Sequence, residues 1–189
     1  MSKTHKKYTG NLLIANPANP LDELEKSVLL IVTHTDQLGV AIQLNNVHDS
    51  LKLDEIAHGV GIEDFPSGIP VYFGGNMNQS KIHVVHSLDW QSHSTVALTP
   101  DIGITNDVSI LAAISQGQGP EMFKSCTGYW IWDDGRLDIQ LNARNRSDEE
   151  PHKWEILPAT LDNVFGLDPE IHWHQVIDDS VNHKVKNWI

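Results

Sequence analysis

The feature that most constrains the fold is a pair of apolar runs joined by one short polar turn. The first run, Val28–Thr33, does not alternate apolar with polar residues, which is typical of a strand buried on both faces. The second run, Val40–Leu44, follows a turn to which Gly39 is suited. We therefore expect a central hairpin that the rest of the chain covers or extends.

Other segments carry the same kinds of signal. Short apolar runs that end at glycine, proline or asparagine predict further strands at Asn11–Ala15, Pro70–Phe73, Ile82–Val85, Thr95–Leu98, Met122–Trp132 and Glu155–Leu157. Apolar residues at helical spacing predict a helix at Leu51–Val60 that stops at Gly59 or Gly61. The same spacing, with capping residues before it, predicts helices after Thr105 and from Asp168 onward. After Gly135, the alternation of Leu137, Ile139 and Leu141 taken alone predicts a hairpin.

The chain shows neither an internal repeat nor a convincing linker, so we predict one α+β domain over residues 10–180. Residues 1–9 are expected to be a flexible basic tail, and residues 181–189 a frayed C-terminus. The most polar stretch, residues 144–153, is expected to be a mobile loop.

Charge and composition limit the function. The formal charge of −12, from 13 basic and 25 acidic residues, argues against sequence-independent binding to nucleic acid or to anionic membranes. No apolar stretch approaches the roughly 18 residues needed to span a membrane. The single cysteine, Cys126, excludes an intramolecular disulfide and favours a reducing compartment. We expect a cytoplasmic protein.

Eleven histidines raise the question of a metal site. His83 and His86 lie three apart on a predicted strand and point to opposite faces. His172 and His174 lie about 200° apart on a helix. No HExxH motif, cysteine pair or GxSxG motif is present, and Cys126 lies in an apolar setting that favours inert burial and a raised pKa. We predict no metal, no cofactor and no catalytic residue.

Five residues remain as candidates for a binding site: His34, Asn45, Gly74, Gly75 and His86. His34 either acts as a base at the mouth of the sheet or bonds backbone in the turn. Asn45 either contacts a ligand or caps a turn. Gly74 and Gly75 either cradle a phosphate or make a tight connection between strands, and Lys81 is poorly spaced for a phosphate loop.

Phrases along nearly the whole chain resemble the YqgE/AlgH family of small bacterial proteins. They are GNLLIANP (10–17), KSVLLIVTH (26–34), LGVAIQLN (38–45), PVYFGG (70–75), HVVHS (83–87), GQGP (117–120), GYWIW (128–132) and PATLDNVFGLDPEIHW (158–173). Family members usually carry an acid where this chain has Thr33, glycines at Leu38 and Ala41, and an Arg-Pro pair at Asn46-Val47. The chain therefore resembles a divergent member with an intact core.

The resemblance implies a compact α+β fold, in which helices flank a mixed or antiparallel sheet that is either open or barrel-like. It also implies a helix rather than a hairpin after Gly135. The family is largely uncharacterised, and some members are described as regulators that affect transcription. Our leading hypothesis is a non-enzymatic protein that binds a protein or small ligand, with any regulatory effect running through a partner.

Two alternatives stay open. A hydrolase or other enzyme would bring His34, Asn45, Gly74, Gly75 and His86 together in one cleft. An assembly protein would use exposed aromatic residues, such as Trp130 and Trp132, as a dimer interface, although aromatic pairs of this kind also build cores.

Overall fold

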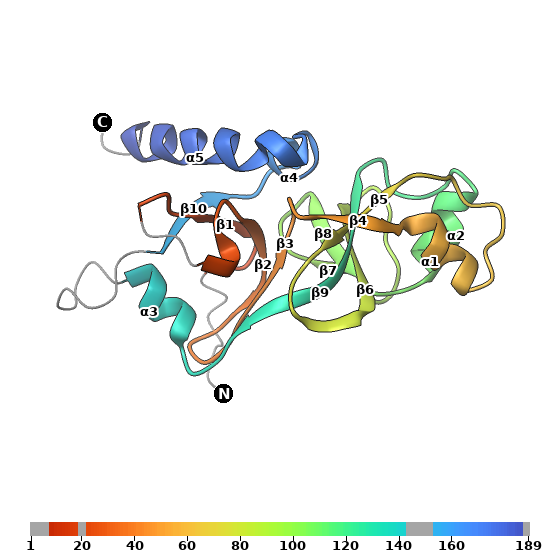
Figure 1. Ribbon diagram of the computed structural model, residues 1–189, viewed down its shortest axis with the longest axis horizontal. Coiled ribbons are helices and arrows are strands. Elements are labelled where there is room, and N and C mark those ends of the chain that lie inside the picture. Colours follow the sequence, from red (N-terminus) through yellow and green to blue (C-terminus); the bar gives the residue numbers. More distant parts are fainter. Residues whose placement is uncertain (1–7, 19–21, 143–152, 187–189) are drawn as a thin grey trace.

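The computed structural model describes residues 8–18, 22–142 and 153–186, and its strands pair into one curled sheet (Figure 1). The order across the sheet is β10-β1-β2-β3-β9-β6-β8-β7, and β5, paired with β4, joins at β9. Only the β5–β9 pair is parallel among these described strands. The strands are β1 (Asn11–Ala15), β2 (Val28–His34), β3 (Gly39–Gln43), β4 (Val47–Lys52), β5 (Pro70–Phe73), β6 (Met77–Ser87), β7 (Val96–Ala97), β8 (Ile102–Thr105), β9 (Phe123–Trp132) and β10 (Trp154–Pro158).

The expected central hairpin is β2 with β3, where Leu29 faces Gln43 and Ile31 faces Ala41. Residues on both faces of β2 are buried, as the continuous apolar run predicts. β1 flanks the hairpin on one side and β9 on the other. The hairpin therefore lies inside the sheet and forms part of the larger of two hydrophobic cores.

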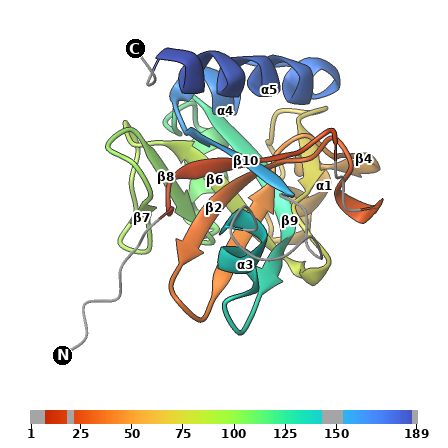
Figure 2. The ribbon, with the colours of Figure 1, turned by 90° about the vertical axis from the view of Figure 1, so that its left-hand side faces the viewer.

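Helices cover the sheet at separate places (Figures 1 and 2). They are α1 (Leu53–Gly59), α2 (Ser109–Ser115), α3 (Arg136–Asn142), α4 (Leu161–Phe165) and α5 (Pro169–Lys186), with one 3-10 turn at Asp22–Leu24. α5 lies across β1 and β10, where the indole of Trp173 donates to the carbonyl of Ala15 at 2.9 Å. Lys184 pairs with Glu155 and fastens the same helix to β10. α1 and α2 pack on the smaller core at the opposite end of the molecule.

After Gly135, the alternation of apolar residues predicts a hairpin, which is wrong. The resemblance predicts a helix there, which is confirmed. Residues 136–142 form helix α3, in which Leu137 and Leu141 are buried and Ile139 is 44% exposed. Leu137 and Leu141 are four residues apart, so they share one helical face, whereas a strand would put Ile139 on that face too. Leu137 and Leu141 fit both a strand and a helix, so only the exposure of Ile139 distinguishes the two structures.

Several other expectations need correction. The predicted helix at 51–60 begins later, because residues up to Lys52 belong to β4. The sequence reading also missed β8 and α4, and α4 begins with a capping box between Thr160 and Asn163. α5 continues to Lys186, so residues 181–186 of the expected frayed C-terminus belong to this helix, and residues 187–189 lie outside the described residues. Residues 1–7 of the expected tail and residues 144–152 of the expected loop lie outside the described residues.

Candidate functional site

His34 closes β2 and is buried rather than open to a cleft. It is 1% exposed, its ring lies 5.2 Å from that of Tyr8, and its Nε2 lies 3.7 Å from Asp138 Oδ2. Its backbone N–H donates to the hydroxyl of Thr9. These contacts tie the end of β2 to α3 and to the chain before β1.

His86 lies far from His34. In the sheet, His34 faces Gly39, which faces Trp132, whereas His86 faces Phe123 near the other end of β9. Those two β9 residues are nine apart, which corresponds to about 30 Å of extended strand. His86 is fully buried, with Nδ1 at 2.8 Å from the carbonyl of Ser87 and its ring edge-on to Trp90. Burial lowers the pKa of His86, so the neutral ring is favoured.

Asn45 has a structural task in the hairpin. Its side-chain oxygen accepts from the N–H of Val28 at 3.0 Å, and its amide donates to the carbonyl of Lys26 at 2.8 Å. Lys26 has a positive φ of 54°, so Asn45 holds a strained turn just before β2. This is turn capping, the structural alternative of the two given by the sequence.

Gly74 and Gly75 make a tight crossing over β9 rather than a phosphate cradle. A Cβ on Gly75 would lie 2.1 Å from the carbonyl carbon of Tyr129, and one on Gly128 would lie 2.3 Å from the oxygen of Gly75. Gly74 donates to Thr127 of β9, and its carbonyl accepts from Gln43 of β3. The prediction that the five candidates converge in one cleft is therefore wrong.

The remaining titratable candidates are also accounted for by packing. Cys126 is buried, and burial raises its pKa to about 12, as its apolar setting predicts. Burial lowers the pKa of neighbouring Lys124 to about 8. Lys124 Nζ donates to the carbonyl of Leu44 and lies 4.9 Å above the ring of Tyr72. It thus anchors β9 to the end of β3. Among the described residues, no group of three His, Cys, Asp or Glu could hold a metal ion.

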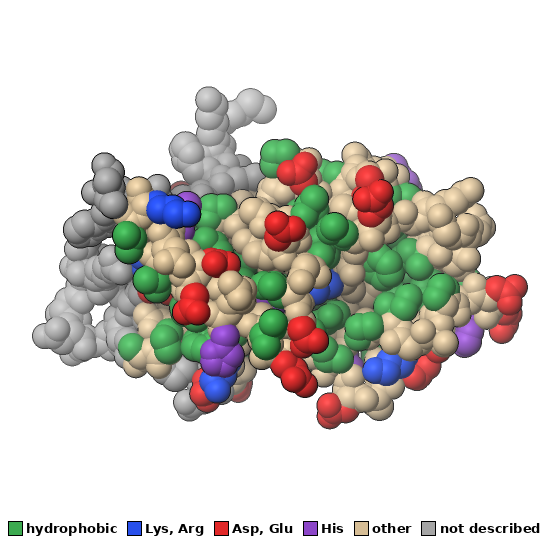
Figure 3. All heavy atoms as spheres, turned by 90° about the horizontal axis from the view of Figure 1, so that it is seen from above, with side chains coloured by type: hydrophobic (Ala, Val, Ile, Leu, Met, Phe, Trp, Pro, Cys, Tyr) green, Lys and Arg blue, Asp and Glu red, His purple; other side chains and the backbone are tan. Residues whose placement is uncertain are grey.

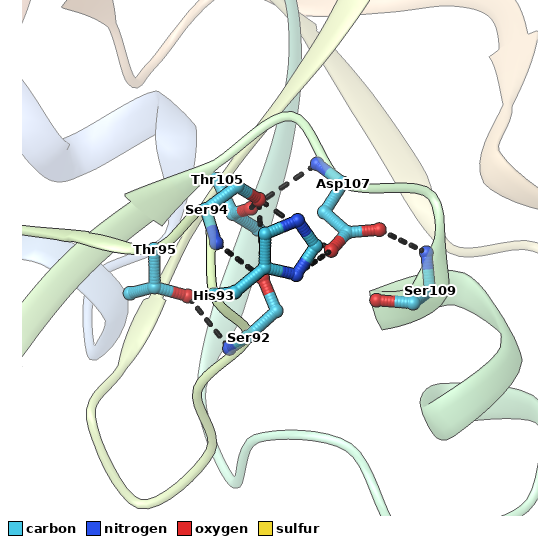
Figure 4. Close-up of polar contacts among 7 residues, drawn as sticks. All are labelled: Ser92, His93, Ser94, Thr95, Thr105, Asp107 and Ser109. Atoms are coloured by element: carbon cyan, nitrogen blue, oxygen red, sulfur yellow. Dashed lines mark hydrogen bonds and ion pairs between the residues drawn. The ribbon is translucent and has the colours of Figure 1, made fainter.

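A serine–histidine–aspartate cluster lies outside the predicted site (Figure 4). His93 Nδ1 is 3.9 Å from Asp107 Oδ2, but its side chain is 92% exposed. Ser94 Oγ donates to Asp107 and pairs with Thr105, so no described serine is hydrogen-bonded to His93 as a nucleophile would be to its base. Asp107 also accepts from the N–H of Ser109, the bond that does most to lower its pKa. The cluster pins the 92–95 loop to the chain entering α2.

The cavity that best fits a small ligand lies next to this cluster, between α1, β6 and the entry to α2. We call it the α1–α2 cleft, and its volume is ≈ 540 Å³. Its lining residues are Leu51, Ile56, Val60, Gln79, Ser80, Lys81, Ile82, Asn106, Val108 and Thr127. The apolar side chains among them belong to the rim of the smaller core or are exposed beside it.

One wall of the cleft is a bulge in β6. Met77 pairs with Tyr129 and Ile82 with Thr127, so residues 78–81 on β6 lie opposite the single residue Gly128 on β9. Gly128 has a φ of +71° and Asn78 one of +54°, which let both strands depart from regular pairing. Residues 78–81 are exposed as a result, and such bulges often re-aim side chains beside binding sites.

The floor of the cleft is polar. Thr127 Oγ1 lies 2.8 Å from His48 Nε2. Ser125, two residues earlier on the same face of β9, is 1% exposed, and its hydroxyl has no hydrogen-bond partner in the described structure. Ser125 pairs with Val71 and Val84, both in the smaller core, and it does not itself line the cleft.

Sequence reasoning missed this cleft. Of the lining residues, only Lys81 was considered for a site from the sequence, as the lysine of a phosphate loop at Gly74-Gly75. The available signal was the polar run Asn78–Lys81 near the start of a long strand, just before the apolar residues Ile82, Val84 and Val85. Only the pairing register shows that this run bulges toward α1 and α2.

Two further cavities lie elsewhere on the molecule, one larger and one smaller than the α1–α2 cleft. A groove of ≈ 800 Å³ runs along α5 beside α4, and it carries both acidic and basic side chains. A hollow of ≈ 150 Å³ lies near Ala15 and Trp173. None of the five predicted residues lines these cavities or the α1–α2 cleft.

The fold and site together define a single α+β domain with an antiparallel sheet curled into a half-barrel. The same fold is found in the solution structure of AlgH from Pseudomonas aeruginosa. That structure has a TM-score of 0.73 and 24% identity, over 96% of this chain and 93% of that one. A crystal structure of a Corynebacterium diphtheriae protein has a TM-score of 0.68 and 17% identity, over 93% and 88% of the two chains.

Sequence relatives give the family. The AlgH-like family model matches residues 12–182. A UPF0301 protein of Gluconobacter oxydans is 30% identical over 172 residues, which cover 89% of this chain and 88% of the relative. A UPF0301 protein of Sphingopyxis alaskensis is 27% identical over 167 residues, or 88% and 85%. The chain belongs to the AlgH-like family, as the shared phrases predict.

Proposed function

We propose that this protein works by binding a small molecule in the α1–α2 cleft, and that it is not an enzyme. The observation that carries the proposal is the cleft itself: a concavity of ≈ 540 Å³ lined by five apolar and five polar side chains. Small-molecule sites have this combination of volume and lining.

The lining favours binding over catalysis. It contains no histidine, aspartate, glutamate or cysteine, and Lys81 is its one titratable side chain. General acid–base or nucleophilic catalysis needs a pair of such groups within hydrogen-bond reach. Two titratable groups lie close behind the lining: His48 is hydrogen-bonded to Thr127, and Asp107 is engaged with the 92–95 loop.

The test uses N-phenyl-1-naphthylamine, an uncharged probe whose fluorescence rises in apolar sites. Val108 lies at the mouth of the cleft and is 51% exposed, so Val108→Trp is expected to fill the mouth without disturbing the core. We expect it to weaken probe binding at least about tenfold, because steric exclusion removes most of the apolar contact.

The matched control is Val181→Trp on α5, a valine of similar exposure that lines none of the three cavities. It is expected to leave probe binding unchanged. Equal binding by the wild type and both variants would contradict the proposal, since the probe would then be bound elsewhere.

Any effect on gene expression is proposed to follow from ligand binding and to act through a protein partner. The net charge of −12 supports a route through a protein partner rather than through direct binding to DNA. The face seen from above shows acidic side chains spread among apolar ones, with isolated basic side chains between them (Figure 3). Such a face repels the phosphates of duplex DNA.

A further inference from the structure

The charge pattern of the α1–α2 cleft indicates which class of ligand it takes, and this step rests on the function proposed above. The protein has 25 acidic residues against 13 basic ones, yet the cleft is lined by one lysine and no carboxylate. Within the described residues, Lys81 has neither an ion pair nor a hydrogen bond. The ammonium group of Lys81 is therefore available to pair with an anionic group of a ligand.

The polar groups of the cleft stand mainly on the β6 bulge and in the turn before α2, where the apolar side chains of Ile82 and Val108 adjoin them. Lys81, Gln79 and Ser80 stand on the β6 bulge, and Asn106 stands in the turn before α2. The other apolar side chains are Leu51 of β4, Ile56 of α1 and Val60, the C-cap of α1. A bound molecule would therefore meet hydrogen-bond donors and a cation on one side and apolar surface on the other.

We infer that the ligand is a small monoanionic amphiphile, with an apolar chain or ring system and one carboxylate. Its apolar body lies along α1, and its carboxylate meets Lys81 with the amides of Gln79 and Asn106 as further donors. A single charge fits better than a phosphate, because a dianion would call for more than one cation.

The experiment compares two probes that share one skeleton. N-phenyl-1-naphthylamine is neutral, and 8-anilinonaphthalene-1-sulfonate is the same ring system with one anionic group. We expect the wild type to bind the anionic probe about two- to fivefold more tightly, the range of one solvent-accessible ion pair. Raising the salt concentration is expected to weaken only the anionic probe.

Substitutions at Lys81 then show whether this residue causes the preference for the anionic probe. Lys81→Gln is expected to abolish it, Lys81→Glu to reverse it and Lys81→Arg to keep it, while binding of the neutral probe stays unchanged in all three. Lys153→Gln, at the start of β10, serves as the distant control and is expected to keep the preference. Unchanged binding of the neutral probe also shows that each variant retains the cleft.

Competition with decanoate and with decanol extends the test to the chemistry of the ligand. Decanoate is expected to displace the neutral probe more strongly than decanol from the wild type, and equally from Lys81→Gln. An unchanged ratio of the two naphthalene probes in Lys81→Gln would overturn the inference and leave the binding proposal intact. Neutral-probe binding that Val108→Trp does not weaken would remove both.

Discussion

At the scale of single residues, the candidates from the sequence are structural residues. His34 and His86 are buried at opposite ends of β9, Asn45 caps a strained turn, and the glycine pair crosses a strand. Each is a residue type that often occurs in sites, because polar and conformationally special residues serve both purposes. What separates the two roles is the packing around each residue, which the chain makes through residues distant in sequence.

Gly75 provides the sharpest test of this view. Gly75→Ala places a methyl group 2.1 Å from the backbone of Tyr129, so β5 and β9 must move apart. We expect a loss of about 3 kcal/mol or more in the free energy of unfolding, since overpacking against backbone relaxes poorly. Urea denaturation measures it. Gly59→Ala, which meets nothing within 4 Å, is the control and is expected to be neutral or slightly stabilising; equal effects of the two would contradict the role of Gly75.

Asn45→Ala tests the cap before β2. The substitution leaves the N–H of buried Val28 without its acceptor, which costs about 1–3 kcal/mol. Asn46→Ala, one residue on and exposed, is expected to change the free energy of unfolding by less than about 0.5 kcal/mol. The same denaturation series measures both, and a loss confined to Asn46→Ala would show that the cap is misplaced.

At the scale of elements, α5 is held by a buried histidine as well as by Trp173. His172 is 0% exposed, and its Nε2 lies 2.7 Å from the carbonyl of Asn163 in α4. Burial, aided by the charge of Lys124, lowers its pKa from 6.5 to about 4. The unfolded chain therefore binds a proton more readily than the folded one between these values. Stability from His172 is complete above pH 6.5 and is lost as pH falls toward 4.

Between pH 7.5 and pH 5, protonation of His172 in the unfolded chain is expected to lower the free energy of unfolding by about 2 kcal/mol. His172→Gln removes the titration and keeps a polar group beside Asn163, so its free energy of unfolding should depend less on pH by that amount. His174→Gln, on the exposed side of the same helix, should retain the wild-type pH dependence. Chemical denaturation at pH 7.5, 6 and 5 checks the difference, and parallel profiles for all three proteins would show that His172 is not the titrating group.

Elements also show how far the sequence could be read. The hairpin β2–β3 followed from two largely apolar runs joined by a short turn, because such runs have few other solutions in a globular domain. α3 was ambiguous because Leu137 and Leu141 fit both a strand and a helix. The bulge in β6 depends on Gly128, some fifty residues further along the chain, so no local pattern reports it. The α1–α2 cleft was missed for that reason.

At the scale of the whole molecule, the fold places the two cores at opposite ends, with the larger under α5 and the smaller under α1 and α2. The cleft opens only at the smaller core. No aromatic side chain is among the large apolar residues exposed in the described part of the chain, and Trp132 is 7% exposed in the larger core. An aromatic dimer interface thus has no support from Trp132, while the half-buried Trp130 packs against Phe73. Trp188 lies outside the described residues.

Within the described part of the chain, no helix is both long enough and apolar enough to cross a membrane. The overall charge of −12 predicts no measurable binding to a fluorescent 30-base-pair duplex in anisotropy titrations at 150 mM salt. Binding that strengthens steeply as salt is lowered would contradict the proposed route through a protein partner.

Titration of ¹⁵N-labelled protein with decanoate shows directly whether the α1–α2 cleft binds a small ligand. We expect amide shift changes concentrated at residues 56–60, 79–82 and 106–108, with saturation at one site. Residues around His34 and His86 should stay unperturbed. Shift changes concentrated along α5, or around those two histidines, would contradict the account.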